Sequence, residues 1–153
     1  MNELVDKLIR EKKTISTMES CIGGGLANAI TNIPGASEVL KFSAVTYSNE
    51  FKIKMGVDKN IIDKYSVYSM ETANEMSKNI SKFTSSTYGV GITGKLKRSD
   101  INNLNGKDNL VYISIYDSIN DKYYNDEIEV TKDAREENKE MVINKVIEII
   151  NNI

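Results

Sequence analysis

The stretch KTISTMESCIGGGLANAI, residues 13–30, decides the fold class of this chain. Residues 13–18 alternate and favour β-branched side chains, which predicts a strand. Ser20 and the glycine run 23–25 follow at a turn, and the apolar segment 26–30 then predicts the start of a helix. A strand, a glycine-rich turn and a helix in this order are typical of a site at the carboxyl end of a strand in an α/β sheet.

The rest of the chain continues this alternation. Apolar residues recur at helical spacing over residues 2–12 and again over 133–151. Three further helices are expected, one that starts near residue 50 and two that span residues 59–64 and 70–82. Four further strands are expected at residues 42–47, 87–93, 110–117 and 123–131. The whole chain, residues 1–153, is therefore expected to form a single α/β domain. Its sheet should be mixed and mostly parallel, with about five strands and with helices on both faces.

Local signals indicate where several elements begin and end. Ser48 with Asn49, Asp58 and Ser69 are suited to cap the three helices that follow them. The only proline, Pro34, precedes a glycine and predicts a turn. The polar stretch 94–109 has the length at which loops are either functional or disordered.

The composition narrows the chemistry that the chain can perform. Its 153 residues include 20 basic and 22 acidic side chains, one cysteine and no histidine. The missing histidine excludes a Ser-His-Asp triad and every histidine-containing metal site. A single cysteine excludes disulfides within the chain and cysteine-cluster metal sites. We expect no metal and no cofactor, so that catalysis would depend on serine, lysine, tyrosine, cysteine or carboxylates.

Charge and hydropathy indicate which partners to expect. A net charge of −2 gives no electrostatic reason to expect nucleic-acid binding. No apolar run approaches the ~20 residues of a membrane span, and the first residues lack the pattern of a signal peptide. A cytoplasmic protein without a membrane partner is the expectation.

Ser20 is the first candidate for a reacting group. Glycines after it allow backbone N–H groups to approach a ligand closely, and a helix N-terminus favours negative charge. A nucleophile at this corner would therefore have an oxyanion site beside it. The alternative interpretation is that Ser20 only caps the helix and that the glycines serve tight packing.

Lys52 and Tyr47 form the second candidate group. If a strand ends at Tyr47 and a helix starts after Asn49, the side chains of Tyr47 and Lys52 can point into one cleft. A buried lysine loses its proton more readily and can act as a base toward a serine hydroxyl. The alternative is that Lys52 lies on a solvated helix face, as most lysines do.

Two weaker candidates remain. Cys21 could act as a thiol nucleophile at a helix N-terminus, but a buried and inert cysteine is the preferred interpretation. Lys95, Lys97 and Arg98 form a small basic cluster that could hold a phosphate, with a solvated loop as the alternative. The acidic residues show no metal-ligand spacing, and no Walker or dinucleotide-binding motif is present.

Two motifs resemble signatures of the CinA C-terminal-domain family, whose enzyme members are the nicotinamide-nucleotide amidases called PncC. TMESCIGG, residues 17–24, resembles the family's A-E-S-C-T-G-G motif, and TYSNEFK, residues 46–52, is similar to its T/A-Y-S-N-E-A-K motif. Between them, NIPGAS at residues 32–37 resembles the D-V/I-P-G-S-S turn. Near the end, REENK at residues 135–139 resembles the G-D-R-x-x-V/I-R segment.

This resemblance implies a three-layer α/β/α sandwich and a homo-oligomer, dimeric or higher. It also implies a metal-independent hydrolase that converts nicotinamide mononucleotide to nicotinate mononucleotide and ammonia. The family's catalytic serine, tyrosine and lysine correspond to Ser20, Tyr47 and Lys52. Lys52 would take the serine proton directly or through Tyr47. Substrate contacts are expected from the matching motifs, at Glu19, Cys21, Gly23, Gly24, Ser48, Asn49, Thr93, Gly94 and Arg135.

The chain departs from the family pattern in two places. After Thr93 and Gly94, the family's loop rich in glycine and proline is replaced by KLKRSD at residues 95–100. In the last segment the family's Gly-Asp is replaced by Asp133-Ala134, and its last arginine by Lys139. Two alternatives to the nucleotide amidase therefore stay open. One is a catalytically impaired domain that binds a nucleotide or serves assembly, and the other is an amidase for another small carboxamide.

Overall fold

Strand β3 (Tyr88–Gly94) is the central strand of a five-stranded sheet, and all seven of its residues are buried. The structure is a computed structural model that describes residues 1–104 and 106–153. The strand order is β2-β1-β3-β4-β5. The other strands are β1 (Ile15–Glu19), β2 (Leu40–Val45), β4 (Leu110–Asp117) and β5 (Lys122–Glu129).

The sheet is mixed, as the sequence predicts. Strand β1 pairs in parallel with β2 and β3, whereas β3 with β4 and β4 with β5 are antiparallel. The expectation of five strands is confirmed, but parallel and antiparallel pairings are equal in number rather than mostly parallel. One reason is that a short connection joins the last two strands into a hairpin. Neighbouring strands joined in this way must be antiparallel, because parallel strands need a long crossover.

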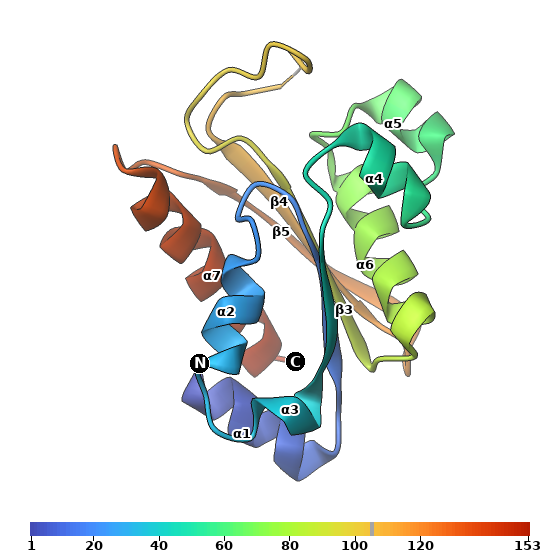
Figure 1. Ribbon diagram of the computed structural model, residues 1–153, viewed down its shortest axis with the longest axis vertical. Helices are drawn as coiled ribbons and strands as arrows, with labels where there is room; N and C mark the ends of the chain where they lie inside the picture. The colour runs from blue at the N-terminus through green and yellow to red at the C-terminus, as the bar shows by residue number, and fades with distance from the viewer. Residues whose placement is uncertain (105) are drawn as a thin grey trace.

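Helices cover both faces of the sheet, which gives the expected three-layer α/β/α sandwich (Figure 1). One layer contains α4 (Asn49–Lys54), α5 (Lys59–Tyr65) and α6 (Met70–Thr84). The opposite layer contains α1 (Asn2–Glu11), α2 (Gly25–Thr31), α3 (Ala36–Val39) and α7 (Arg135–Asn151). The sequence does not predict the single turn of α3, which starts directly after the Pro34-Gly35 turn.

Two apolar cores lie on the two sides of the sheet. The larger core packs α1, α2 and α7 against the sheet, and the predicted stripe of the last helix contributes Val142, Val146 and Ile150. The smaller core lies under α6. On that side, a Cβ atom at Gly89 or Gly91 would lie 2.0 or 2.3 Å from a backbone oxygen of α6. Only glycine therefore permits α6 to pack this closely on β3.

The predicted helix caps are formed. Ser48, Asp58 and Ser69 each accept a hydrogen bond from a backbone N–H in the first turn of the helix that follows. These bonds satisfy donors that have no partner within a helix. The start of α4, on which Lys52 depends, is thus fixed by its own sequence.

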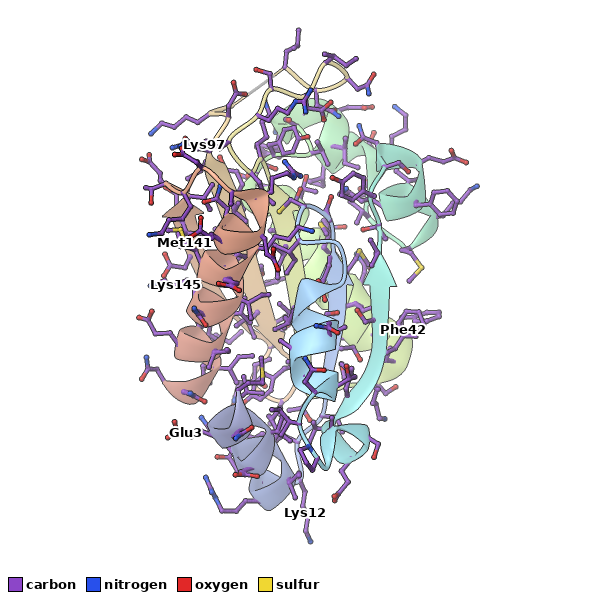
Figure 2. All side chains as sticks on the ribbon, turned by 60° about the vertical axis from the view of Figure 1, so that its left-hand side comes forward. Glu3, Lys12, Phe42, Lys97, Met141 and Lys145 are labelled. Carbon is purple, nitrogen blue, oxygen red and sulfur yellow. The ribbon has the colours of Figure 1, made fainter. Side chains whose placement is uncertain are left out.

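Strand β2 ends at Val45, two residues earlier than expected, so Thr46 and Tyr47 belong to the connection to α4. Strand β2 lies at one edge of the sheet, where β1 pairs with it on one side, and its Phe42 side chain points outward (Figure 2).

No helix in the described residues is long and apolar enough to cross a membrane.

The carboxyl ends of the three parallel strands lie side by side and position the candidate site. The backbone N–H of Ser20, just past β1, donates to the carbonyl of Ile92 at 3.0 Å. The N–H of Thr46, just past β2, donates to the carbonyl of Glu19 at 2.8 Å. These two bonds bring the chain after β1 and the chain after β2 to one edge of the sheet.

Candidate active site

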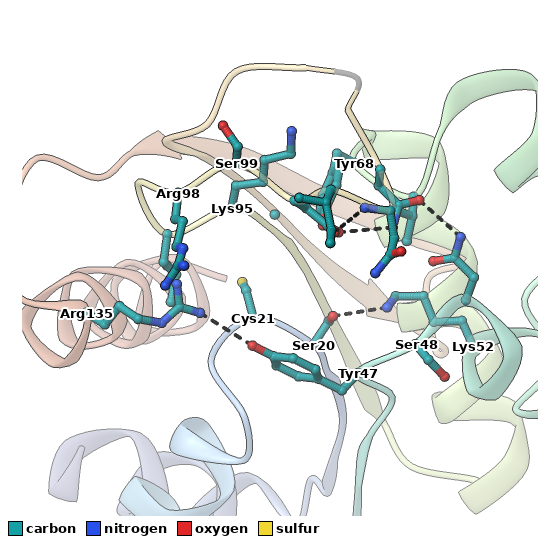
Figure 3. A pocket seen from close by; sticks show the side chains of 18 residues that line it. Ser20, Cys21, Tyr47, Ser48, Lys52, Tyr68, Lys95, Arg98, Ser99 and Arg135 are labelled. Atoms are coloured by element: carbon teal, nitrogen blue, oxygen red, sulfur yellow. Dashed lines mark hydrogen bonds between the residues drawn. The ribbon is translucent and has the colours of Figure 1, made fainter.

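The structure brings Ser20 and Lys52 into direct contact. The Nζ atom of Lys52 lies 3.0 Å from the Oγ atom of Ser20 and donates to the carbonyl of Thr46 at 2.7 Å (Figure 3). Ser20 is 8% exposed and Lys52 is 2% exposed. A serine hydroxyl and a buried amine at hydrogen-bond distance have the geometry of a nucleophile and its base.

Burial changes the acidity of Lys52. Desolvation lowers the pKa of its ammonium from 10.5 to about 8, because the charged form is disfavoured away from water. Among the residues that the structure describes, no carboxylate lies within ion-pair distance of the Lys52 amine. Lys52 is therefore still mostly protonated at pH 7, but it loses its proton far more readily than a solvated lysine and can accept one in its neutral form.

The turn after Ser20 does not serve as a helix cap. The N-cap of α2 is Gly24, which has a positive φ of 89°, and Ser20 lies four residues before it. The first free N–H groups of α2 are instead bound by the buried carboxylate of Glu19, at 3.2 Å from Leu26 N and 3.0 Å from Ala27 N. The capping alternative for Ser20 is thus not what the structure shows.

Backbone N–H groups beside Ser20 remain available for a ligand. Within the described residues, the N–H groups of Cys21, Ile22 and Gly24 have no protein acceptor, whereas that of Gly23 donates to the Ser20 carbonyl. Free amides next to a nucleophile are the donors that an oxyanion requires.

Tyr47 lies at the mouth of the site, where its side chain is 65% exposed. Its Oη atom accepts a hydrogen bond from Nη2 of Arg135 at 3.4 Å (Figure 3). Lys52 contacts Ser20 directly, whereas the Tyr47 hydroxyl points toward Arg135.

The Ser20–Lys52 pair opens into a cavity of about 780 Å³. We call its two walls the floor (residues 20–21 and 46–52) and the roof (residues 95–104, in the loop between β3 and β4). The roof is part of the predicted 94–109 loop, in which Asn105 lies outside the described residues. The floor carries Ser20 and Lys52, and the roof is the segment in which the chain departs from the family pattern.

A hydrogen-bond network holds the roof over the floor. The Tyr68 hydroxyl donates to the carboxylate of Asp100, which also accepts from the side chain of Asn103 at 3.0 Å. Asn103 in turn accepts from the side chain of Asn49 at 3.2 Å. Sequence reasoning missed Tyr68, Asp100 and Asn103, because nothing in their spacing indicates that they meet.

The basic cluster of the roof does not act as one group. Lys95 is buried and pairs with Asp108 at 3.2 Å, and Lys97 pairs with Asp133 at 2.8 Å, outside the cavity (Figure 2). Only Arg98 presents its side chain to the cavity without a salt bridge within the described part of the chain, on the same side as Arg135 (Figure 3). Two guanidinium groups are thus available for an anion at this end.

The structure separates the other expected contact residues into two groups. Cys21, Ser48, Asn49, Gly94 and Arg135 line the cavity together with Ser20. The remaining four, Glu19, Thr93, Gly23 and Gly24, do not.

Each of these four residues has another position or role. Glu19 is fully buried beneath α2, and the buried Thr93 donates its hydroxyl to the carbonyl of Val67 at 2.9 Å. Gly23 and Gly24 face a second cavity of about 940 Å³ between α2 and α7. The side chains of Glu19 and Thr93 thus already bond to protein groups and do not line the cavity, so the structure shows structural roles for both and not the expected contact with a ligand.

Cys21 is not a competing nucleophile. It is 5% exposed, and burial raises the pKa of its thiol to about 12. The thiolate is the reactive form, so Cys21 is inert near neutral pH. Among the described residues, no group of three or more histidine, cysteine or carboxylate side chains could hold a metal ion.

Fold and site together define an α/β sandwich domain with a buried serine–lysine pair at the carboxyl ends of its parallel strands. A model of the CinA C-terminal domain family matches residues 1–153. The chain therefore belongs to the CinA C-terminal-domain family.

Relatives and solved structures agree with this membership. A CinA-like protein from Desulforapulum autotrophicum is 43% identical over 88 residues, which are 57% of this chain and 21% of that protein. The chain spans 21 to 28% of the length of the curated relatives that it matches.

Among solved structures, the competence/damage inducible protein CihA from Agrobacterium tumefaciens has a TM-score of 0.85 at 25% identity, over 99% of this chain and 93% of that chain. A CinA superfamily protein from Klebsiella pneumoniae has a TM-score of 0.90 at 19% identity, over 99% and 92% of the two chains. The second likeness shows the fold alone.

Proposed function

We propose that this domain hydrolyses the carboxamide of nicotinamide mononucleotide to nicotinate mononucleotide and ammonia, with Ser20 as nucleophile and Lys52 as general base. The observation that carries the proposal is the 3.0 Å contact between the Ser20 hydroxyl and a buried lysine whose pKa is lowered to about 8. A lysine in a helix is normally solvated, and its burial against a serine supports a catalytic role.

The first half of the reaction forms an acyl-enzyme. Neutral Lys52 removes the hydroxyl proton of Ser20 while Oγ bonds to the carboxamide carbon. The free N–H groups of Cys21 and Ile22 are suited to stabilise the oxyanion that forms. Protonated Lys52 then gives its proton to the departing nitrogen, so that ammonia leaves and an ester to Ser20 remains.

The second half regenerates the enzyme. Lys52, neutral again, takes a proton from water as the water oxygen bonds to the ester carbon. The bond between that carbon and Oγ breaks, and Lys52 returns the proton to Ser20. Arg98 and Arg135 at the far end of the cavity are suited to bind the phosphate. One guanidinium group can donate two parallel hydrogen bonds to two phosphate oxygens.

Ammonia release from nicotinamide mononucleotide, measured with a chelator present, tests this function. Wild-type protein should release ammonia and Ser20→Ala should not, while the surface control Ser37→Ala keeps wild-type activity. Binding without release by folded wild-type protein would contradict the hydrolase and favour a nucleotide-binding domain. Release from other small carboxamides alone would contradict the choice of substrate.

A further inference from the structure

Asp100 places a fixed carboxylate on the wall of the cavity. Three neutral donors hold it: the Tyr68 hydroxyl, the Asn103 side chain at 3.0 Å and the backbone N–H of Asn102 at 2.9 Å. These hydrogen bonds keep the pKa of the carboxyl below its ordinary value, so it is ionised at neutral pH. Its orientation and its charge are both set before any ligand arrives.

This carboxylate has no counter-ion within ion-pair distance among residues 1–104 and 106–153. The buried ammonium of Lys95 influences it electrostatically, but that ammonium pairs with Asp108 at 3.2 Å and lies 4.9 Å from the centre of the Tyr68 ring. A charge that is ordered by neutral groups and left without a cation is available to a charged ligand.

Asp100 is the one carboxylate among the described residues that line the cavity, whose cations are Lys52, Lys95, Arg98 and Arg135. Arg98 and Arg135 lie together on one side, whereas Tyr68, which binds Asp100, lies on the side of Lys52 (Figure 3). The charge of Asp100 also reaches Lys52, whose pKa it raises against the larger effect of burial. The partner of Asp100 thus lies on the side of Lys52, and the two guanidinium groups lie on the opposite side (Figure 3).

We propose that Asp100 is a specificity-determining residue that selects a substrate whose carboxamide is carried on a positively charged ring. The inference rests on the proposed function and adds the property of the ring that the site recognises. The pyridinium ring of nicotinamide mononucleotide carries its positive charge next to the carboxamide, and its phosphate is at the other end. This distribution is complementary to Asp100 on one side and to the two arginines on the other.

Binding to protein that cannot turn over separates recognition from catalysis. In a Ser20→Ala background, the Kd of nicotinamide mononucleotide is compared with that of benzamide riboside 5′-monophosphate, which has the same shape and a neutral ring. Adding Asp100→Asn keeps an oxygen acceptor for the roof and removes the charge. It should weaken the binding of the charged nucleotide about fivefold and leave the neutral one unchanged.

A matched control addresses the role of Asp100 in holding the roof. Asp133→Asn removes another carboxylate that holds the same loop, one that does not line the cavity and that pairs with Lys97, which does not line it either. Any effect of this change should be equal for the two ligands. If Asp100→Asn also weakens both ligands equally, Asp100 is only a tether and the proposal is overturned.

The same measurements distinguish this inference from the proposed function. Ammonia release by wild-type protein together with equal effects of Asp100→Asn on both ligands would leave the function standing and overturn the inference. Selective binding of the charged ring without ammonia release would support the inference and contradict the function. Failure of the Ser20→Ala protein to bind nicotinamide mononucleotide would overturn the inference.

Discussion

The floor and the roof of the cavity are built by opposite means. The floor places Ser20 and Lys52 at strand ends and in a capped helix, almost fully buried and bonded to each other and to backbone. The roof is mostly exposed from Lys97 onward, and side chains such as Asp100 and Asn103 hold it. Under the proposed function, the chemistry depends on rigid, buried elements and the choice of substrate depends on a loop that can change.

The largest expected effect is on the floor. Lys52→Met removes the general base and should lower ammonia release about 10³-fold. Lys54→Met is the matched control, because Lys54 lies on the same helix but is exposed and pairs with Glu50 at the surface. Steady-state rates of ammonia release by the two variants test this prediction. Equal loss of rate in both variants would show that Lys52 is not the general base.

The same substitution should stabilise the fold. Below pH 8 folded Lys52 is protonated at a desolvation penalty that the unfolded chain does not have, and this penalty disappears as pH rises from about 8 to 10.5. After allowance for the lost bonds to Ser20 and Thr46, Lys52→Met should raise the free energy of unfolding by about 2 kcal/mol at pH 7. Denaturant unfolding of wild-type and Lys52→Met protein at pH 7 and pH 10 measures this increase and shows whether it becomes smaller at the higher pH. A lower free energy of unfolding for Lys52→Met at pH 7 would contradict the prediction.

The pH dependence of the rate follows from the same pKa. Because only neutral Lys52 can accept the serine proton, kcat/KM should rise about tenfold per pH unit below pH 8 and level off above it. The profile of wild-type protein, with Lys54→Met as a control that keeps the profile, measures this. A rate that does not change between pH 6 and pH 8 would remove Lys52 from the proton transfer.

A smaller effect is expected at Thr46, which also belongs to the floor. Its hydroxyl is buried and has no hydrogen-bond partner within the described structure. Thr46→Val keeps the shape and removes the unsatisfied group, so the free energy of unfolding should increase by about 1 kcal/mol. Thermal unfolding of this variant beside wild-type protein gives the answer, and a decrease would mean that the hydroxyl does have a partner.

The smallest effect is expected in the roof. Tyr68→Phe removes one of the donors to Asp100 but leaves its charge, and should raise KM about threefold with little change in kcat. Kinetics with nicotinamide mononucleotide test this. A loss of kcat as large as that of Lys52→Met would show that floor and roof act as one unit, contrary to the comparison.

Several features could be predicted from sequence because they depend on neighbours in the chain. The glycine run after Ser20, the caps at Ser48 and Ser69, and the apolar stripe of α7 all lie within local patterns and are confirmed. The position of Lys52 could not be predicted in this way. On α4 it is the buried residue, while Phe51 and Ile53 beside it are exposed, the reverse of ordinary amphipathic order.

The sequence by itself determined the class of fold, the Ser20 turn and the two family motifs, because hydrophobic period, glycine and capping act over a few residues. The homo-oligomer that the resemblance implies stays a prediction. Only the tertiary structure decided that Glu19 supports α2, that Tyr47 points to Arg135 and that Asp100 meets Tyr68 from 32 residues away. Such contacts depend on how strand ends and loops meet in space, and no local pattern in the chain records that.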